Sequence, residues 1–378
     1  YSITDRHLPS SEVAEKEAIT NFLKKKEIDK VLKSKIKELN KALDNVKICD
    51  PAIGSGAFPM GLLHEIFTAK QTLHTFEHGN TKTFDASGVK LNIIQNSIYG
   101  VDIEKGAVDI ARLRFWLSLI VDEEKPKALP NLDYKIVVGN SLVSKLGEDI
   151  IDIDWDLNET SHGLFGADLA KQKGDLLKKI SQEQKDFFKP NSDKKKLAAD
   201  IRNLKIDLLT NQLELMVKTQ GIETKPTGNG KAIAKQTALY LQTLGWKDHI
   251  KQLNKLKSKP ELPLHFFDWK LDFPEVMNPL LKENGGLNTA VGFDIVIGNP
   301  PYVDSENMIK SQPIIREFIN HKFLSAKGNW DLYIPFHEQA IKILKTNGIK
   351  SFITPNKWLS IAYANELRLL YINLLYKI

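Results

Sequence analysis

Apolar positions along the first third of the chain follow two spacings, which predict helices and short strands in alternation. From Ser10 to Val46 they return every three or four residues among lysines and glutamates, as in an amphipathic helix. Helical spacing also covers residues 58–73 and 107–121. Residues 75–90 have the Gly, Asn, Thr and Ser content of a loop, so we expect no helix there.

Short apolar runs with β-branched residues lie between these helices, and each ends in a small or polar residue. The runs cover residues 46–50, 97–102, 135–140 and 293–299. A helix at 333–344 and a strand at 348–354 complete the alternation. This order predicts an α/β fold with a mostly parallel sheet flanked by helices, and with its chemistry at the carboxyl ends of the strands.

The alternation is interrupted once, and the interruption predicts an insertion into the sheet domain. It contains helical runs at 197–217 and 233–256, separated by a stretch rich in Pro, Gly and Asn. We therefore expect four segments. They are an N-terminal helical segment at 1–45, the first half of the sheet domain at 46–145, a mostly helical basic insertion at 146–287, and the second half of the sheet domain at 288–378.

The composition is that of a soluble globular protein, with 42% hydrophobic and 26% charged residues in 378. No apolar run reaches the ~18 residues that span a bilayer, and the N-terminus lacks a secretory pattern, so we expect a cytoplasmic protein without a membrane partner. The single cysteine, Cys49, excludes an internal disulfide and a cysteine zinc cluster. The nine histidines show no ligand spacing, and no metal is expected.

The net charge of +6 is unevenly distributed along the chain. Residues 171–259 contain 20 Lys and Arg against 9 Asp and Glu, so the remainder is slightly acidic. A local basic surface indicates a polyanionic partner such as nucleic acid, because neutralised phosphates release their counterions. On charge alone, the simpler explanation is a solvated helix face.

A turn rich in small residues comes after the first strand and indicates a ligand site. It runs from Asp50 to Phe58, and its glycines, Gly54 and Gly56, allow a ligand close to the backbone at the start of a helix. Pro59 stands where the dinucleotide fingerprint has its third glycine, and no Gly-Lys-Ser/Thr comes after it, so neither phosphate-binding motif matches.

Polar residues also end the next two strands. Asp102 could accept hydrogen bonds from two ribose hydroxyls, and Ile103 beside it could cover a purine face. Asp102 and Asn140 could each be an ordinary helix cap. The cap explanation is weakened because Asp50, Asp102 and Asn140 end successive strands and would converge on one sheet edge.

The strongest chemical signal is the tetrapeptide Asn299-Pro300-Pro301-Tyr302 after an apolar strand. A residue before proline is held extended, and two prolines stiffen a loop whose carbonyls can accept hydrogen bonds. A carboxamide oxygen, a carbonyl and a flat ring together form a receptor for a planar amide or an aromatic amine. An ordinary proline turn is the alternative.

Taken in order, these segments resemble the gamma group of S-adenosylmethionine-dependent DNA adenine-N6 methyltransferases. The segments Phe266–Trp269, Phe273–Val276 and Asn329–Tyr333 look like those of single-chain restriction-modification enzymes (type IIG) and of BREX-type phage-defence methylases. The resemblance covers about residues 46–359. It implies a Rossmann-like methyltransferase fold, S-adenosylmethionine as cofactor and double-stranded DNA as partner.

The resemblance also implies a role for each matching residue. Asn299 and Pro300 would accept from the target amine, and Tyr302 would stack on a base flipped out of the duplex. Asn140 stands where many relatives have an aspartate that contacts the cofactor's adenine amine, so we expect weaker cofactor binding. The implied catalytic residues are Asn299, Pro300, Pro301 and Tyr302. The implied cofactor residues are Asp50, Pro51, Ala52, Gly54, Gly56, Phe58, Asp102, Ile103, Asn140 and Ser141.

Departures from the family pattern leave other functions open. The Tyr-Thr-Pro element usual before the cofactor motif is not recognisable in residues 1–12, and the chain stops before an aromatic second plate is expected. We therefore expect the methylase core of a longer protein, whose nuclease and sequence-reading domains would be partners. A protein glutamine or RNA amine methyltransferase, or a non-catalytic module that holds DNA for a nuclease, are the alternatives.

Overall fold

The computed structural model describes residues 10–121, 132–157, 164–189, 192–278 and 291–375, and the chain forms two compact units. The sheet unit consists of Tyr1–Val138, Phe293–Pro301 and Asn347–Pro355. The helical unit consists of Gly139–Gly292, Tyr302–Thr346 and Asn356–Ile378. The four-segment division expected from the sequence stays a prediction.

A five-stranded sheet with the order β3-β2-β1-β6-β7 is the centre of the sheet unit. β1 pairs in parallel with β2 on one side and with β6 on the other, and β2 pairs in parallel with β3. This confirms the predicted α/β, Rossmann-like fold with a mostly parallel sheet. The strands are β1 (Ile48–Asp50), β2 (Ile98–Asp102), β3 (Ile136–Val138), β6 (Phe293–Gly298) and β7 (Leu344–Phe352).

The strand order reverses between β1 and β6. After β1 the chain continues outward through β2 and β3, and it returns to the other side of β1 only with β6. Ligands of open α/β sheets bind in the crevice beyond the carboxyl ends of the strands at such a reversal. The segments after Asp50 and after Gly298 are therefore the first places to look for a site.

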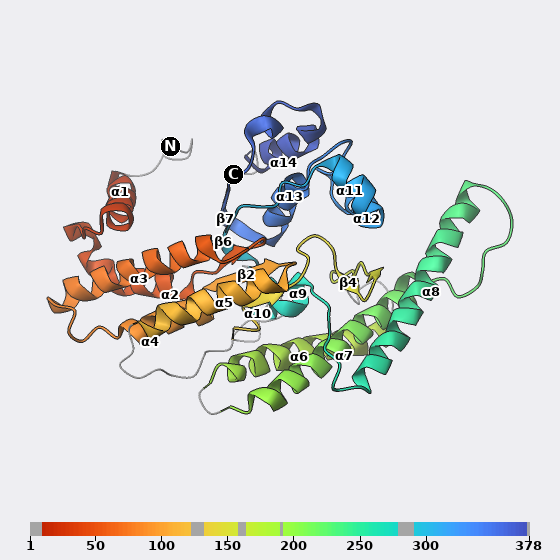
Figure 1. Ribbon diagram of the computed structural model, residues 1–378, viewed down its shortest axis with the longest axis horizontal. Helices are drawn as coiled ribbons and strands as arrows, with labels where there is room; N and C mark the ends of the chain where they lie inside the picture. Colours follow the sequence, from red (N-terminus) through yellow and green to blue (C-terminus); the bar gives the residue numbers. More distant parts are fainter. Residues whose placement is uncertain (1–9, 122–131, 158–163, 190–191, 279–290, 376–378) are drawn as a thin grey trace. The chain divides into compact units, whose positions relative to one another are not determined.

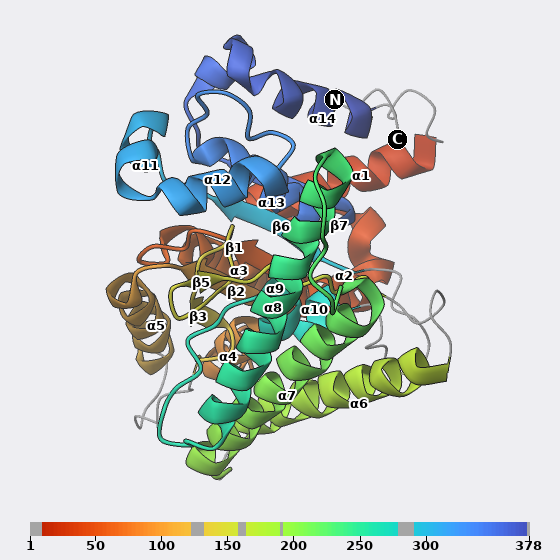
Figure 2. The same cartoon turned by 90° about the vertical axis from the view of Figure 1, so that its right-hand side faces the viewer.

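Three helices of the sheet unit pack against β1, β2 and β3 (Figure 2). They are α3 (Ala57–His78), α4 (Ala86–Asn96) and α5 (Lys105–Ile120). Ile48, Ile98 and Ile136, one from each strand, are buried against Phe115 of α5 in a single apolar core. This core fixes the strands whose ends carry the candidate residues.

The helix expected over residues 10–46 forms as three pieces. They are α1 (Ser10–Lys25), a 3₁₀ helix (Lys30–Lys35) and α2 (Ile36–Asn45). Lys26 has a left-handed φ of 59°, which ends α1, and the Asp29 carboxylate accepts from Val31 N to start the next piece. The apolar spacing continues across this break because Phe22, Leu32 and Ile36 share one buried cluster.

The prediction of a loop over residues 75–90 is wrong at both ends, where the chain is helical. α3 continues to His78 and ends at Gly79, whose left-handed φ of 76° closes the helix. α4 begins at Ala86 because the Asp85 carboxylate accepts from Gly88 N. The polar composition of this stretch thus belongs to two helix ends and their caps, which a composition argument does not separate from a loop.

The helical unit is dominated by three long helices, α6 (Leu164–Phe187), α7 (Lys194–Gln220) and α8 (Lys231–Lys257) (Figure 1). α7 packs against both α6 and α8. The predicted helical runs at 197–217 and 233–256 lie within α7 and α8. The shorter elements are β4 (Lys145–Leu146), β5 (Asp149–Ile150), α9 (Trp269–Asp272), α10 (Pro274–Met277), α11 (Ser305–Ser311), α12 (Pro313–Lys322), α13 (Tyr333–Ile343), two 3₁₀ helices (Asn356–Leu359 and Ala362–Ala364) and α14 (Asn365–Leu375).

The last predicted helix and strand form with shifted bounds. α13 ends at Ile343, and β7 begins at Leu344, four residues before the expected start at Gly348. No helix in the described ranges is both long and apolar enough to cross a membrane.

Candidate active site

The turn after β1 is held by hydrogen bonds to the ends of β1 and β2. The Asp50 carboxylate accepts from Ala52 N at 3.0 Å, and Ile53 N donates to the Val101 carbonyl at 3.0 Å. Gly54 N donates to the Asp102 carboxylate at 2.8 Å. The turn is thereby fixed to the end of β2 before any ligand binds.

The two glycines of this turn are required by its backbone conformation. Gly54 has φ +52° and Gly56 has φ +82°, both in the left-handed region that side chains disfavour. A Cβ on Gly56 would lie 3.2 Å from Cβ of Ala111 in α5, so this side of the turn is also tightly packed. α3 begins at Ala57, and its first N–H groups therefore lie at the turn.

Asp102 joins two turns instead of capping α5 with its side chain. Its second carboxylate oxygen accepts from Glu104 N at 2.9 Å, and α5 begins at Lys105 without a side-chain cap. Ile103 is 61% exposed. A carboxylate next to an exposed aliphatic chain is thus present at the end of β2, as the predicted ribose and purine contacts require.

The end of β6 lies directly against Asp50. A Cβ on Gly298 would be 2.7 Å from Oδ1 of Asp50, so the glycine is what allows the two segments to approach. Asn299 comes immediately after it and is exposed, whereas Pro300 is buried and Pro301 is exposed. The turn after β1 and the first three residues of the tetrapeptide therefore meet at the strand-order reversal of one unit.

Asp50 is the buried charge of this site. It is 1% exposed, and burial, together with the nearby Asp102 carboxylate, raises the pKa of Asp50 to about 7 despite the hydrogen bond from Ala52 N. Among the described residues, no lysine, arginine or histidine forms an ion pair with it. A ligand that brings a positive charge to this carboxylate would favour its ionised form.

The turn after β3 belongs to the helical unit, and its polar side chain is used locally. Oδ1 of Asn140 accepts from Leu142 N at 2.9 Å and from Val143 N at 3.2 Å, which is an ordinary turn cap. A contact from this side chain to a cofactor would have to come from its amide nitrogen or replace these bonds. The role of Asn140 in cofactor binding stays a prediction.

The motif Phe266–Trp269 supports the turn after β3. Nε1 of Trp269 donates to the Ser141 carbonyl at 3.0 Å, and a Cβ on Gly139 would lie 2.3 Å from Cγ of Phe267. The Phe267 and Trp269 rings meet edge to face at 5.2 Å. In the sequence, this motif was recognised only by its similarity to other enzymes. Its local pattern did not predict a contact with the turn at Gly139.

The predicted site residues thus divide between the two units. The sheet unit brings together the ends of β1, β2 and β6 with the turns after them. The helical unit holds Asn140, Ser141 and Tyr302. In the sheet unit the predicted residues are Asp50, Pro51, Ala52, Gly54, Gly56, Phe58, Asp102, Ile103, Asn299, Pro300 and Pro301.

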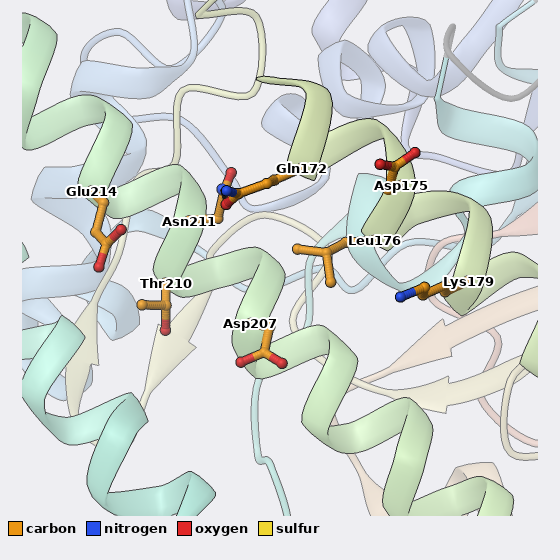
Figure 3. A pocket seen from close by; sticks show the side chains of 8 residues that line it. All are labelled: Gln172, Asp175, Leu176, Lys179, Asp207, Thr210, Asn211 and Glu214. Carbon is orange, nitrogen blue, oxygen red and sulfur yellow. Dashed lines mark hydrogen bonds between the residues drawn. The ribbon is translucent and has the colours of Figure 1, made fainter. Parts of the chain in front are cut away.

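A pocket of about 430 Å³ lies between α6 and α7, and none of the predicted site residues lines it (Figure 3). Its charged side chains are Asp175, Asp207, Glu214 and Lys179. Three carboxylates against one ammonium group do not suit the phosphates of a nucleic acid. Among the described residues, no group of three or more His, Cys, Asp or Glu side chains could hold a metal ion.

A parallel sheet with a glycine turn, a strand-end carboxylate and a proline-stiffened loop at its strand reversal has the arrangement in which open α/β sheets bind their ligands. The model of the Eco57I restriction-modification methylase family matches residues 96–377, well over half of the chain. The chain belongs to this family. Such enzymes need a methyl donor, and restriction-modification methylases act on DNA.

Several relatives agree with this family. A candidate type II restriction enzyme and methyltransferase of Methanocaldococcus jannaschii is 28% identical over 85% of this chain and 27% of its own length. The adenine-specific methyltransferase BrxX of Escherichia coli is 23% identical over 86% of this chain and 22% of its own length. The restriction enzyme and methyltransferase RM.Eco57I of Escherichia coli is 34% identical over 20% of this chain and 8% of its own length.

These relatives confirm the resemblance to adenine methyltransferases of restriction-modification and BREX type. They also confirm the predicted enzyme class. This chain spans about a quarter of the length of the two relatives that it matches over most of its own length.

Proposed function

We propose that this chain is the methylase core of a longer restriction-modification or phage-defence protein, and that it transfers a methyl group from S-adenosylmethionine to the exocyclic N6 amine of adenine in double-stranded DNA. The single observation that carries the proposal is the approach of the β6 end to the turn after β1. It sets Asn299 beside a buried carboxylate and a glycine turn at the strand reversal.

The residues of the sheet unit fit this cofactor. S-adenosylmethionine supplies an electrophilic methyl group on a positively charged sulfur. Asp50 is a buried carboxylate for which the described residues supply no cation, and it would gain a partner from the ligand's positive charge. The open backbone at Gly54 would admit the ligand, because nothing lies within 4 Å of a Cβ at that position. Asp102 would exchange its bond to Gly54 N for the ribose hydroxyls.

Asn299 and Pro300 would prepare the nucleophile. The lone pair of an adenine amine is delocalised into the ring, which makes the amine a poor nucleophile. Two acceptors on its hydrogens, Oδ1 of Asn299 and the Pro300 carbonyl, would favour a tetrahedral nitrogen whose lone pair can attack in line. A new N–C bond forms, the S–C bond breaks with its electrons on sulfur, and the amine loses one proton to solvent.

The proposed DNA surface is α8, which carries nearly half of the basic surplus of residues 171–259. This helix carries six lysines and one acidic residue, Asp248. Lys231, Lys235, Lys251 and Lys255 are exposed, and none of them forms an ion pair with a described residue. Such lysines would exchange bound counterions for phosphates, so the affinity of the chain for DNA should fall steeply as salt rises. If the affinity for DNA does not change with salt, the lysines of α8 form an ordinary solvated helix face.

Labelled methyl transfer with a choice of acceptors tests the proposal. The chain is incubated with methyl-labelled S-adenosylmethionine and bacterial genomic DNA, RNA or protein, and calorimetry measures cofactor binding. We expect label in DNA as N6-methyladenine, and we expect Asn299→Ala to lower its rate at least about a hundredfold without changing cofactor affinity. Asn45→Ala, at an exposed asparagine of α2 outside the proposed site and DNA surface, is the matched control and should leave both unchanged.

Each of the other outcomes would support one of the alternative functions. Label confined to RNA or to protein would replace the DNA substrate with an RNA or protein amine. Cofactor binding without label in any acceptor would favour a non-catalytic module that holds DNA.

A further inference from the structure

The motif Asn329–Tyr333 has no role in the function proposed so far, although the helical unit fixes it from several sides. Trp330 is fully buried, and its Nε1 donates to Oδ1 of Asn320 at 2.5 Å. The Arg316 guanidinium lies 4.4 Å from the centre of the Trp330 ring and donates to the Gly328 carbonyl at 2.8 Å. One end of the motif is therefore anchored to α12.

The next residue anchors the motif to the segment after β7. Asp331 is 8% exposed, and its carboxylate accepts from the Tyr363 hydroxyl at 2.9 Å and pairs with the Lys357 ammonium group at 2.5 Å. A buried carboxylate that accepts from two donors holds its backbone firmly, because a shift would break bonds to a poorly solvated group. The position of Leu332 and Tyr333 is thus determined before they touch anything else.

The motif then contacts the end of the tetrapeptide. Leu332 N donates to the Val303 carbonyl at 2.8 Å, one residue beyond Tyr302. The ring of Tyr333, which is 1% exposed, meets the ring of Tyr302 edge to face, with centroids 6.1 Å apart and planes at 89°. Tyr302 itself is 52% exposed. A buried ring therefore packs at a right angle against an exposed ring.

We infer that Tyr333 is a positioning residue that sets the plane of the Tyr302 ring for stacking on the target base. The inference rests on the proposed function, in which Tyr302 is the stacking plate. A tyrosine on a loop can rotate about two side-chain bonds, and stacking needs one ring plane. An edge-to-face partner restricts that rotation, and Tyr302 remains half exposed.

The competing explanation is that Tyr333 only fills the core. Tyr333 also contacts His337, which in turn packs against Tyr371 at 6.0 Å and shares a hydrogen bond of 2.7 Å with its hydroxyl. Tyr371 belongs to the same aromatic cluster and is linked to Tyr333 through His337. Tyr371→Leu is therefore a matched control that disturbs the cluster and leaves the Tyr302–Tyr333 ring pair in place.

Two measurements on the whole chain test the positioning role. The first is ¹⁹F NMR of fluorotyrosine-labelled protein without DNA or cofactor, with the Tyr302 signal assigned by its loss in Tyr302→Phe. We expect Tyr333→Leu to shift or broaden that signal and Tyr333→Phe, which keeps the ring, to restore it. Tyr371→Leu should leave it in place.

The second measurement is methyl transfer to genomic DNA. Stacking is made in both the bound and the reacting complex, so Tyr333→Leu should raise KM for DNA about two- to tenfold with kcat nearly unchanged. Tyr333→Phe should recover the normal KM, and the affinity for S-adenosylmethionine should not change. The inference is overturned if Tyr333→Leu leaves the Tyr302 signal and KM as in the parent, or if Tyr371→Leu changes both equally. If the parent chain transfers no methyl group to DNA, the proposed function fails, while the NMR result still decides whether Tyr333 orients Tyr302.

Discussion

Asp50 in the sheet unit and Asp272 in the helical unit are both buried carboxylates, but among the described residues only Asp272 has a cation of its own. Asp272 is 6% exposed, accepts from Asp268 N at 2.9 Å and pairs with the buried ammonium group of Lys205 at 2.7 Å. Asp50 is 1% exposed, has a backbone donor and pairs with no cation in the described part of the chain. A buried charge that is paired internally is part of the architecture, whereas one that lacks a partner points to a ligand.

The largest expected effect is on stability, from the loss of the ion pair between Lys205 and Asp272. Lys205→Met removes the cation and leaves Asp272 buried with an uncompensated charge, which should lower the free energy of unfolding by about 3–5 kcal/mol. Urea unfolding measures the change. The double variant Lys205→Met/Asp272→Asn should recover much of the loss, because the carboxamide still accepts from Asp268 N without a charge. A loss under ~1 kcal/mol would mean that the pair is hydrated.

A smaller effect is expected from Asp50→Asn, and it should lower ligand affinity instead of stability. Asp50→Asn keeps an acceptor for Ala52 N and removes a buried charge, so stability at pH 8 should be unchanged or higher. Affinity for S-adenosylmethionine should fall about tenfold to a hundredfold, the equivalent of about 1.5–3 kcal/mol for a charge-assisted contact. Calorimetric titration and urea unfolding measure the two quantities.

Asp109→Asn, at an exposed carboxylate of α5 that pairs with Lys105, is the matched control for the Asp50 variant and should change neither quantity. A destabilised Asp50→Asn protein with normal affinity for the cofactor would place Asp50 with Asp272 among the architectural charges.

The pH dependence of stability should reveal the titration of Asp50. The pKa of Asp50 is about 7 in the folded chain against an ordinary value of 3.8. Between these values the unfolded chain loses the proton first, so the free energy of unfolding should fall as pH rises from about 4 to about 7, by up to ~1.4 kcal/mol per unit. Urea unfolding at a series of pH values measures this slope, and in Asp50→Asn this contribution should vanish.

Cofactor affinity should change in the opposite direction over the same range. A positively charged ligand binds the ionised carboxylate better, so affinity should rise up to about tenfold per unit as pH increases from about 5.5 towards 7 and then level off. The Asp50→Asn variant should show a flat profile over this range. If the affinity of the parent chain is independent of pH, Asp50 does not contact the charged part of the ligand.

The strand ends were predictable because each depends on a few consecutive residues. An apolar run that ends at Asp50, at Asp102 or just before Asn299 indicates both where a strand stops and which polar group lies at its end, and a parallel sheet brings such ends together. The α/β fold was therefore predicted correctly. The roles given to these residues stay predictions, since the geometry of the turns is consistent with them but contains no ligand.

The features of the site and of the buried ion pair that the sequence did not reveal join distant segments. Nothing near Gly298 in the chain indicates that it must be glycine for Asp50 to fit against it, because the two residues lie on different strands. The Lys205–Asp272 pair is likewise invisible in a count of lysines, which assigned Lys205 to a basic surface. Charge and composition describe residues one at a time, whereas burial and pairing are decided by packing.

The smallest expected effect tests whether burial, and not pairing alone, makes Lys205 structural. Lys257 at the end of α8 pairs with Asp207 of α7 at 2.5 Å, but the two side chains are 44% and 37% exposed. Water solvates both charges and salt screens them, so Lys257→Gln should change the free energy of unfolding by less than about 1 kcal/mol, and about 1 M NaCl should reduce even that difference. A loss from Lys257→Gln as large as that from Lys205→Met would contradict this view, because the cost would then depend on the helix–helix pairing instead of the burial of the charge.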